Sequence, residues 1–333
     1  MVKKTGPKGN DFATFHFSIR SQRETIRKGT DMTGRTIRLI VATLTAIPLA
    51  LALGGEKRFE KKFSVSPGGT LHVATDVGSI KITGTGSNEV SVVAQLRGRD
   101  RDVEGFEITA EETKGGVEVL GKGKFKRGWF WNSSELTVDY TIQVPREYSL
   151  DVQTSGGDVE VSSLKGEIRG GTSGGNIVLG AIEGKVMMET SGGDIRVEKT
   201  TGDLKMQTSG GNITIGNVEG AVDVGTSGGD IRLGEVRGRV RAETSGGNVR
   251  VKVTGANDGI YAETSGGNIE VMIGKNVGAD LDAATSGGEV ECELPVTVKG
   301  KISESRIRGT VNGGGKMIYA HTSGGNVSIK AIP

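Results

Sequence analysis

Side chains that commonly perform catalysis or hold metals are few in this sequence. The chain of 333 residues contains one cysteine and three histidines: Cys292, His16, His72 and His321. A single cysteine excludes an intramolecular disulfide and a zinc cluster built from cysteines. His321 is the only histidine within the repeats described below, and its spacing from serine and aspartate residues does not suggest a Ser-His-Asp triad. We therefore predict no catalytic residues, no metal site and no cofactor.

One short segment gathers aromatic and basic side chains that could stack on a ligand. Residues 121–131 read Gly-Lys-Gly-Lys-Phe-Lys-Arg-Gly-Trp-Phe-Trp and contain both tryptophans of the chain. Cations beside aromatic rings can contact sugars, nucleobases or a membrane interface. The alternative is a hairpin tip that folds back to cover the apolar edge of neighbouring strands. The candidate binding residues of this loop are Lys122, Lys124, Phe125, Lys126, Arg127, Trp129, Phe130 and Trp131.

Acidic and amide side chains alternate at one repeated position, where carboxylates could form a ladder for cations. The calcium-binding repeat Gly-Gly-x-Gly-x-Asp has a period of about nine residues and a different glycine pattern, so it does not match. Asparagines between the aspartates would separate successive carboxylates by roughly 9–10 Å at the usual strand spacing, which weakens their repulsion. We therefore interpret the position as a stabilised turn rather than a calcium site. Its residues are Asp158, Asn176, Asp194, Asn212, Asp230 and Asn248.

The repeat that carries these positions predicts the secondary structure. Thr-Ser-Gly-Gly recurs along the second half of the chain, and its first five steps are eighteen residues each. Within residues 190–207, apolar side chains alternate at Ile195 and Val197, and again at Leu204 and Met206. A period of two is typical of β-strands, so each unit should hold two short strands separated by glycine turns. The repeats begin at Thr154, Thr172, Thr190, Thr208, Thr226, Thr244, Thr264, Thr285 and Thr322.

A single unit of this kind cannot bury its own apolar face, so the units must stack. Stacking at about 4.8 Å would place Ile195 between Ile177 and Ile213 in a continuous aliphatic core. The sequence therefore predicts an all-β, single-domain β-solenoid with coils of about eighteen residues. We expect the repeated threonines to point inward, with their hydroxyls bonded to the turn backbone. We expect the paired glycines to supply positive φ angles.

The regular repeat divides the chain into regions. Residues 56–150 should form an N-terminal β region that holds a first coil near residues 77–84, the Trp-rich hairpin insert, and strands that cap the stack. Residues 151–333 should form the regular β-solenoid. At its far end we expect Cys292, Leu294 and Val296 to continue the core, and Tyr319 to help close it.

The N-terminal residues have the pattern of an export signal. Residues 39–53 are nearly all apolar, basic residues precede them, and small residues follow. This order is typical of a secretory signal peptide, which we place at residues 32–55, and its cleavage would leave no stable membrane span. Residues 1–31 are then an over-extended start or a disordered tail. The alternative is an uncleaved membrane anchor with a basic cytoplasmic tail.

Several motifs resemble those of the bacterial putative-adhesin domain family. They are Phe-x-Val-x-Pro-Gly-Gly-x-Leu-x-Val at residues 63–73, Gly-x-Ile-x-Ile-x-Gly at 78–84, Val-Pro at 144–145, and the serial Ser-Gly-Gly-Asp/Asn-Ile-x-Val units. The resemblance covers residues 56–333. It implies a right-handed β-helix, a bacterial source and an envelope location, and it supplies no catalytic residues. The very regular repeat and the Trp-rich insert are departures from the family pattern.

These features predict a non-catalytic exported protein of adhesion or scaffold type, located in the periplasm, on the cell surface or outside the cell. Its partner would be envelope polysaccharide, peptidoglycan or an envelope protein. The net charge of +2 gives no reason to expect nucleic acid. Two alternatives stay open: a β-helix enzyme acting on envelope polysaccharide, and a structural partner of a membrane stress sensor. The sequence does not set the oligomeric state.

Overall fold

The computed structural model describes residues 55–124, 136–298 and 303–332. These residues form two long β-sheets, A and B, and one short helix, α1 (Asp100–Glu104). No helix of the described residues is long and apolar enough to cross a membrane. The predicted tail at residues 1–31, and all of the predicted signal peptide except its last residue, lie outside the described residues.

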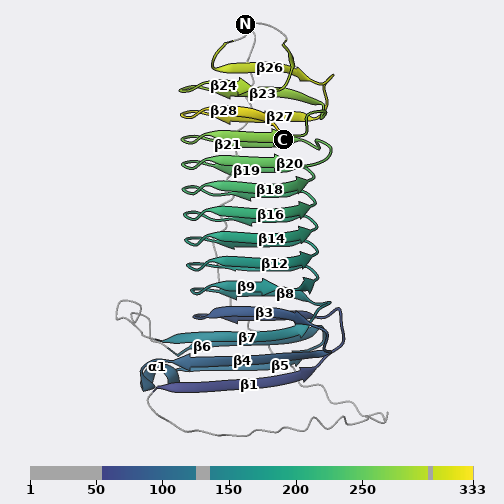
Figure 1. Cartoon of the computed structure of the whole chain (residues 1–333). Coiled ribbons are helices and arrows are strands. Elements are labelled where there is room, and N and C mark those ends of the chain that lie inside the picture. Colours follow the sequence, from purple (N-terminus) through teal and green to yellow (C-terminus); the bar gives the residue numbers. More distant parts are fainter. Residues whose placement is uncertain (1–54, 125–135, 299–302, 333) are drawn as a thin grey trace, which may run out of the picture. The chain divides into compact units, whose positions relative to one another are not determined.

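Sheet A contains the strands that follow the Gly-Gly turns, together with strands from both ends of the stack (Figure 1). In spatial order its strands are β1 (Glu56–Ser64), β4 (Glu89–Arg97), β7 (Thr137–Pro145), β3 (Ser79–Thr85), β9 (Val159–Ser162), β12 (Ile177–Glu183), β14 (Ile195–Thr201), β16 (Ile213–Glu219), β18 (Ile231–Arg237), β20 (Val249–Val253), β22 (Ile269–Ile273), β28 (Val327–Ala331) and β24 (Val290–Cys292), with β10 (Leu164–Lys165) pairing beside β12.

Sheet B contains the strands that lead into the Gly-Gly turns, together with strands from both ends of the stack. In spatial order its strands are β25 (Val296–Val298), β26 (Arg306–Val311), β23 (Ala279–Thr285), β27 (Met317–Thr322), β21 (Ile260–Thr264), β19 (Val240–Thr244), β17 (Val222–Gly225), β15 (Leu204–Gln207), β13 (Val186–Thr190), β11 (Ile168–Thr172), β8 (Ser149–Thr154), β2 (Thr70–Thr75), β6 (Gly116–Gly123) and β5 (Phe106–Thr113).

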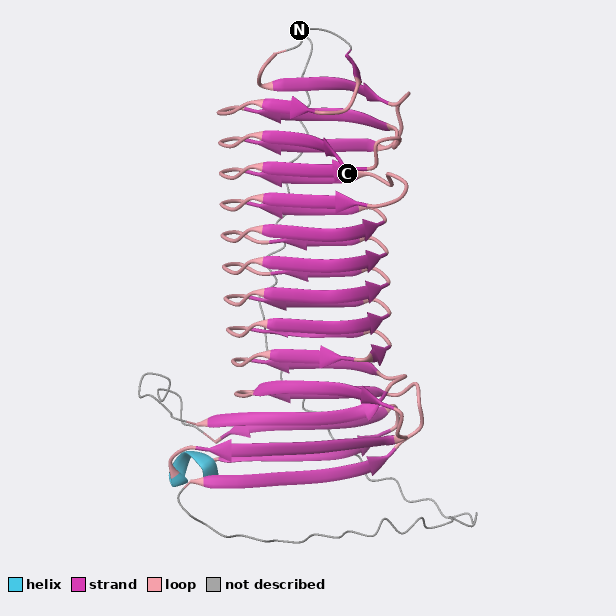
Figure 2. Cartoon of the chain, in the orientation of Figure 1, coloured by secondary structure: helices cyan, strands magenta, loops and turns pink. Residues whose placement is uncertain are grey.

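The predicted β-solenoid is confirmed. Each regular coil gives one strand to each sheet, and equivalent strands of adjacent coils pair in parallel and in register (Figure 2). Ile195 pairs with Ile177 on one side and with Ile213 on the other, as the eighteen-residue period requires. The winding sense stays a prediction.

Alternation within each strand fills the space between the two sheets with aliphatic side chains. Ile177, Ile195 and Ile213 are 0%, 1% and 0% exposed, and their polar neighbours point outward. Full burial of a side chain of this size contributes about 1.5–3 kcal/mol. Because every coil adds the same kind of residues, the core continues along the stack and holds all coils in one register.

The paired glycines do not act as predicted. Among those of the Thr-Ser-Gly-Gly turns, only Gly157, with φ of 114°, has a positive φ angle, so that prediction is wrong for the regular coils. The second glycine is required by close packing instead. A Cβ at Gly193 would lie 2.0 Å from the carbonyl oxygen of Gly175 in the adjacent coil. Positive φ occurs at the opposite turn, for example 147° at Gly202.

The N-terminal end of the stack has a coil inserted out of sequence order. β2 lies between β6 and β8, and β3 lies between β7 and β9. Antiparallel strands then extend both sheets, β4 and β1 in sheet A and β5 in sheet B. The edge strand β1 carries Lys57, Arg58, Lys61 and Lys62. Charges on an edge strand oppose pairing with other chains, so this edge of sheet A is protected.

The C-terminal end has the same kind of insertion. β27 pairs with β21 and β23, and β28 pairs with β22 and β24, so the last coil in the sequence is not the last in space. The antiparallel strands β26 and β25 follow β23 at this end of sheet B. Leu294 is buried there, whereas Cys292 and Val296 are partly buried. The prediction that Tyr319 closes the end is wrong, because β27 lies one coil inside it.

Candidate ligand-binding face

The repeated threonines hold adjacent turns together. All nine are buried, and each hydroxyl donates to a glycine carbonyl of the adjacent coil. Thr190 Oγ1, for example, donates to the Gly175 oxygen at 2.8 Å and accepts the Gly193 N–H at 3.4 Å. The hydroxyl satisfies two backbone groups at once, which gives the position a structural role. The threonines so placed are Thr154, Thr172, Thr190, Thr208, Thr226, Thr244, Thr264, Thr285 and Thr322.

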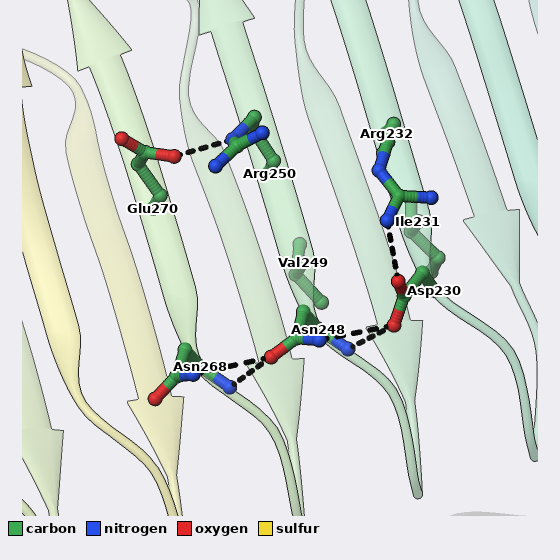
Figure 3. A pocket seen from close by; sticks show the side chains of 8 residues that line it. All are labelled: Asp230, Ile231, Arg232, Asn248, Val249, Arg250, Asn268 and Glu270. Atoms are coloured by element: carbon green, nitrogen blue, oxygen red, sulfur yellow. Dashed lines mark hydrogen bonds and ion pairs between the residues drawn. The ribbon is translucent and has the colours of Figure 1, made fainter.

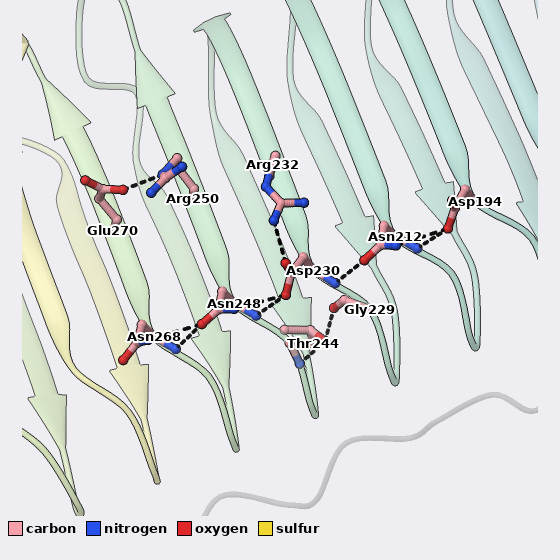
Figure 4. A network of polar contacts seen from close by, with 11 residues as sticks. Asp194, Asn212, Gly229, Asp230, Arg232, Thr244, Asn248, Arg250, Asn268 and Glu270 are labelled. Carbon is pink, nitrogen blue, oxygen red and sulfur yellow. Dashed lines mark hydrogen bonds and ion pairs between the residues drawn. The ribbon is translucent and has the colours of Figure 1, made fainter.

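Next to the threonines, the alternating Asp and Asn side chains form a continuous hydrogen-bonded ladder on the outside of the turn (Figure 4). Each Oδ1 accepts the backbone N–H of the equivalent residue in the next coil: Asp194 accepts from Asn212 at 2.7 Å, and Asn212 from Asp230 at 2.9 Å. Each Asn amide that follows an aspartate in the ladder also donates to Oδ1 of that aspartate, as Asn176, Asn212 and Asn248 do. The hydrogen bonds of this ladder continue through Asn248, Asn268, Asn326 and Glu289.

The ladder explains why this position favours aspartate and asparagine. The first residue after each turn would otherwise leave a backbone N–H without a partner, and a side chain with one short carbonyl or carboxylate arm reaches it. The backbone N–H of Asn248 lowers the pKa of Asp230, and the Asn248 amide and Arg232 add to this effect. Among the described residues, no three His, Cys, Asp or Glu side chains are grouped so that they could hold a metal ion.

A depression of about 280 Å³ lies where this ladder meets the outer face of sheet A (Figure 3). Strands β18, β20 and β22 supply its lining, with Ile231 and Val249 of the core beneath it. The polar residues that line it are Asp230, Arg232, Asn248, Arg250, Asn268 and Glu270.

Two arginines face each other across adjacent strands in this depression. Arg232 pairs in register with Arg250, and like charges in that arrangement repel. Each is balanced by a carboxylate: Arg232 Nη2 lies 2.6 Å from Asp230 Oδ2, and Arg250 Nε donates to Glu270. Lys330 Nζ lies 3.0 Å from the second oxygen of Glu270.

These contacts leave a surface with both donors and acceptors. Burial raises the pKa of Glu270, but hydrogen bonds from Lys330 and Arg250 outweigh it and hold that pKa below its usual range. Nε and Nη1 of Arg232, and both Nη atoms of Arg250, have no hydrogen-bond partner among the described residues. Guanidinium donors beside amide and carboxylate groups are suited to hydrogen-bonding a ligand with many hydroxyl groups.

Only the first two candidate residues of the predicted binding loop lie within the described part of the chain. Lys122 and Lys124 lie at and just beyond the end of β6, and Lys124 Nζ is 3.0 Å from Glu107. The aromatic and basic residues Phe125, Lys126, Arg127, Trp129, Phe130 and Trp131 lie outside the described residues. The loop therefore stays a prediction.

Sequence reasoning missed the depression, because its charged residues share no motif. Alignment of the repeats could have indicated it, because Arg232, Arg250 and Glu270 occupy the same outward position in successive coils. The place of His321 one residue before the repeated Thr322 predicts an exposed side chain, and this needs correction. The side chain is 23% exposed, and its Nε2 lies 3.1 Å from Asp282 Oδ1.

Comparison with known sequences now identifies the family. The profile of the Toastrack DUF4097 family matches residues 69–330. The chain belongs to this family. That assignment confirms the resemblance to putative-adhesin domains drawn from the repeat motifs. A comparison with curated proteins gives no match.

Solved structures are similar to this Toastrack chain at low sequence identity. A putative adhesin from Parabacteroides distasonis is 15% identical with a TM-score of 0.48, and the match covers 83% of this chain and 97% of that one. A putative lipid binding protein from the same species is 14% identical with a TM-score of 0.41, covering 84% and 98%. A putative adhesin from Bacteroides fragilis is 12% identical with a TM-score of 0.34, covering 83% and 97%.

Proposed function

We propose that this protein is a non-catalytic binding module of the cell envelope, of adhesion or scaffold type. Its partner on the outer face of sheet A is a hydroxyl-rich polymer, either envelope polysaccharide or peptidoglycan. The depression lined by Arg232, Arg250, Asn248, Asn268, Asp230 and Glu270 carries the proposal. The envelope location rests on the signal-like residues 32–55 and on family membership.

The chemistry of the depression suits sugar hydroxyls, which both donate and accept hydrogen bonds. The arginines offer unused N–H groups, and the carboxylates of Asp230 and Glu270 offer acceptor lone pairs. The net charge around the depression is small, +1, since Arg232, Arg250 and Lys330 stand beside the two carboxylates of Asp230 and Glu270. A neutral or weakly charged polar ligand therefore fits the lining better than a strongly anionic one.

The stacked coils hold these groups rigidly before any ligand arrives. The ladder fixes Asn248 and Asn268 at the base of the depression, because each is hydrogen-bonded to the coil before it. Groups that are already ordered lose little conformational entropy on binding. The strands also repeat at about 4.8 Å, so an extended polymer can contact successive coils.

The test is a binding assay of the purified protein with isolated envelope polysaccharide and with peptidoglycan. We expect saturable binding that falls at least tenfold in the Arg232→Ala/Arg250→Ala variant. The control is Arg58→Ala/Arg169→Ala, which removes the same charge from side chains that are 59% and 57% exposed, against 52% and 57% at the depression.

Three other outcomes would contradict the proposal. Equal losses in the two double variants would mean that binding follows overall charge. Loss only in Trp129→Ala/Trp131→Ala would move the site to the predicted loop. Release of soluble sugar during incubation would favour the enzyme alternative.

A further inference from the structure

A second cluster of functional side chains lies on the outer face of sheet B, near the C-terminal end. Tyr261 of β21 and Tyr319 of β27 stack with ring centroids 4.7 Å apart and an angle of 6° between the rings. His321 stacks on Tyr319 with centroids 3.8 Å apart. The guanidinium carbon of Arg241 lies 4.5 Å from the Tyr261 centroid. The rings thus cover one another and leave their edges toward solvent.

The inserted coil brings this cluster together. β27 lies between β21 and β23, so Tyr319 faces Tyr261 on one side and Asp282 on the other. Asp282 in turn faces Arg308 of β26. If the coils stacked in sequence order, Tyr319 would not lie beside Tyr261. The insertion therefore creates a surface that the repeat spacing does not show.

Asp282 is the centre of the charged part of this surface. Arg306 Nη2 lies 2.9 and 3.2 Å from its two oxygens, Arg308 Nε and Nη2 lie 3.2 and 2.5 Å from Oδ2, and His321 Nε2 lies 3.1 Å from Oδ1. The Asp282 side chain is only 13% exposed, whereas Arg306 and Arg308 are 45% and 62% exposed. One shielded carboxylate thus faces two accessible guanidinium groups.

Among the described residues, the other carboxylates of this face make no hydrogen bond to Arg306 or Arg308. Glu243 pairs with Arg241, Glu263 accepts the hydroxyl of Tyr261, and Asp280 lies beside Met317 and Thr310. Nε and Nη1 of Arg306 have no partner among the described residues, and neither has Nη1 of Arg308. The arginine pair therefore has unused donors that point away from Asp282.

We propose that Arg306 and Arg308 bind an oxyanion, a carboxylate or a phosphate, carried on a sugar or similar ring. The planar guanidinium group donates two parallel hydrogen bonds to either group, which makes arginine the usual residue for this purpose. The ring that carries the anion would lie against the edge of Tyr319 and the side chain of Met317, which is 50% exposed. This site is on the face opposite the depression in sheet A and does not depend on it.

The alternative is that the contacts of Arg306 and Arg308 with Asp282 only stabilise the pairing of β26 with β23. Substituting Asp282 separates the two roles. If the arginines bind an external anion, Asp282 competes with it, so Asp282→Asn should bind the anion more tightly. If these contacts have only a structural role, Asp282→Asn should lower the stability of the protein without creating or strengthening anion binding.

The experiment follows the arginine Nε–H signals by NMR in the full chain during titration with galacturonate or glucose 6-phosphate. Galactose and glucose serve as the neutral controls. We expect saturable shifts of the Arg306 and Arg308 signals with at least one charged probe and none with the neutral sugars. Affinity should rise at least threefold in Asp282→Asn and fall at least tenfold in Arg306→Lys/Arg308→Lys, which keeps the charge but loses the paired donors.

A matched variant, Asp223→Asn, removes another outward carboxylate of sheet B that lies 3.8 Å from Lys205, and it should leave the affinity unchanged. Thermal unfolding of each variant checks that it is folded. Shifts with galacturonate alone would identify a carboxylate site, and shifts with glucose 6-phosphate alone a phosphate site. Absence of shifts with both probes, or an affinity in Asp282→Asn no higher than in the unsubstituted chain, would overturn the proposal.

Discussion

Two neighbouring glycines of one turn should respond very differently to the same substitution. In Gly211→Ala, the new Cβ would lie 2.0 Å from the carbonyl oxygen of Gly193, a backbone atom that cannot move away alone. In Gly210→Ala, the closest atom is the Gly192 oxygen at 3.5 Å, an ordinary contact. Both variants add one methyl group to the same turn, but only Gly211→Ala places it against the adjacent coil. The difference in their stability therefore measures the effect of close packing between coils.

The cost of Gly211→Ala follows from what must separate. Relief of the clash requires the two turns to move apart by more than ~1 Å, since a carbon and an oxygen rarely approach within about 3 Å. That movement breaks the hydrogen bond from Asn212 N–H to Asp194, and the bond from Thr208 to the same Gly193 oxygen. With about 1 kcal/mol for each bond and 1–3 kcal/mol for overpacking, we expect a loss of about 3–5 kcal/mol. Gly210→Ala should change stability by less than about 1 kcal/mol.

Urea unfolding followed by far-ultraviolet circular dichroism measures both variants. Hydrogen exchange at the Asn212 amide reports whether the loss is local to the altered turn, as expected when each coil contacts only its neighbours. Equal midpoints for Gly211→Ala and Gly210→Ala would refute the packing argument, and so would a stable Gly211→Ala protein with a protected Asn212 amide.

Substitutions at three further positions test the same physical account. Thr226→Val should cost about 1–3 kcal/mol in urea unfolding, because it leaves a buried glycine carbonyl and N–H without their partner, and Thr226→Ser should restore most of this loss. Because the pKa of Asp230 is lowered in the folded state, its ionised carboxylate stabilises the fold above about pH 4, and this stabilisation is lost as the pH falls through the folded-state pKa. Acid should therefore lower the unfolding midpoint of Asp230→Asn less than that of the unsubstituted chain. Ile318→Ala in the inserted coil should cost about 2–5 kcal/mol by the same assay, because its side chain is fully buried between two neighbouring coils; a loss below about 1 kcal/mol would mean that the insertion contributes little.

The regular part of the fold could be predicted because two periods are visible in the sequence. Alternation within Ile195 and Val197 indicates strands, and the eighteen-residue step sets their register. The order of the end coils could not be predicted in the same way. The step of thirty-seven residues from Thr285 to Thr322 fits two coils in sequence, whereas the structure pairs Thr322 with Thr264 and Thr285 at once.

Both candidate sites depend on spatial relations that the repeat hides. Arg232, Arg250 and Glu270 form a column only once the register is known, because the step from β20 to β22 is longer than eighteen residues. Tyr261 and Tyr319 meet only because a coil is inserted between its neighbours. The role of the paired glycines is hidden for a related reason, since the constraint comes from the adjacent coil and not from the local backbone.

The most direct test of the proposed function is NMR mapping of the chain during separate titrations with soluble peptidoglycan fragments and with envelope polysaccharide. We predict saturable changes in the side-chain amides of Asn248 and Asn268 and in the Nε–H signals of Arg232 and Arg250, with little change at the outward residues of β12 and β14. Changes confined to the loop at residues 122–131 or to sheet B, or no changes with peptidoglycan and envelope polysaccharide, would contradict a ligand site on the outer face of sheet A.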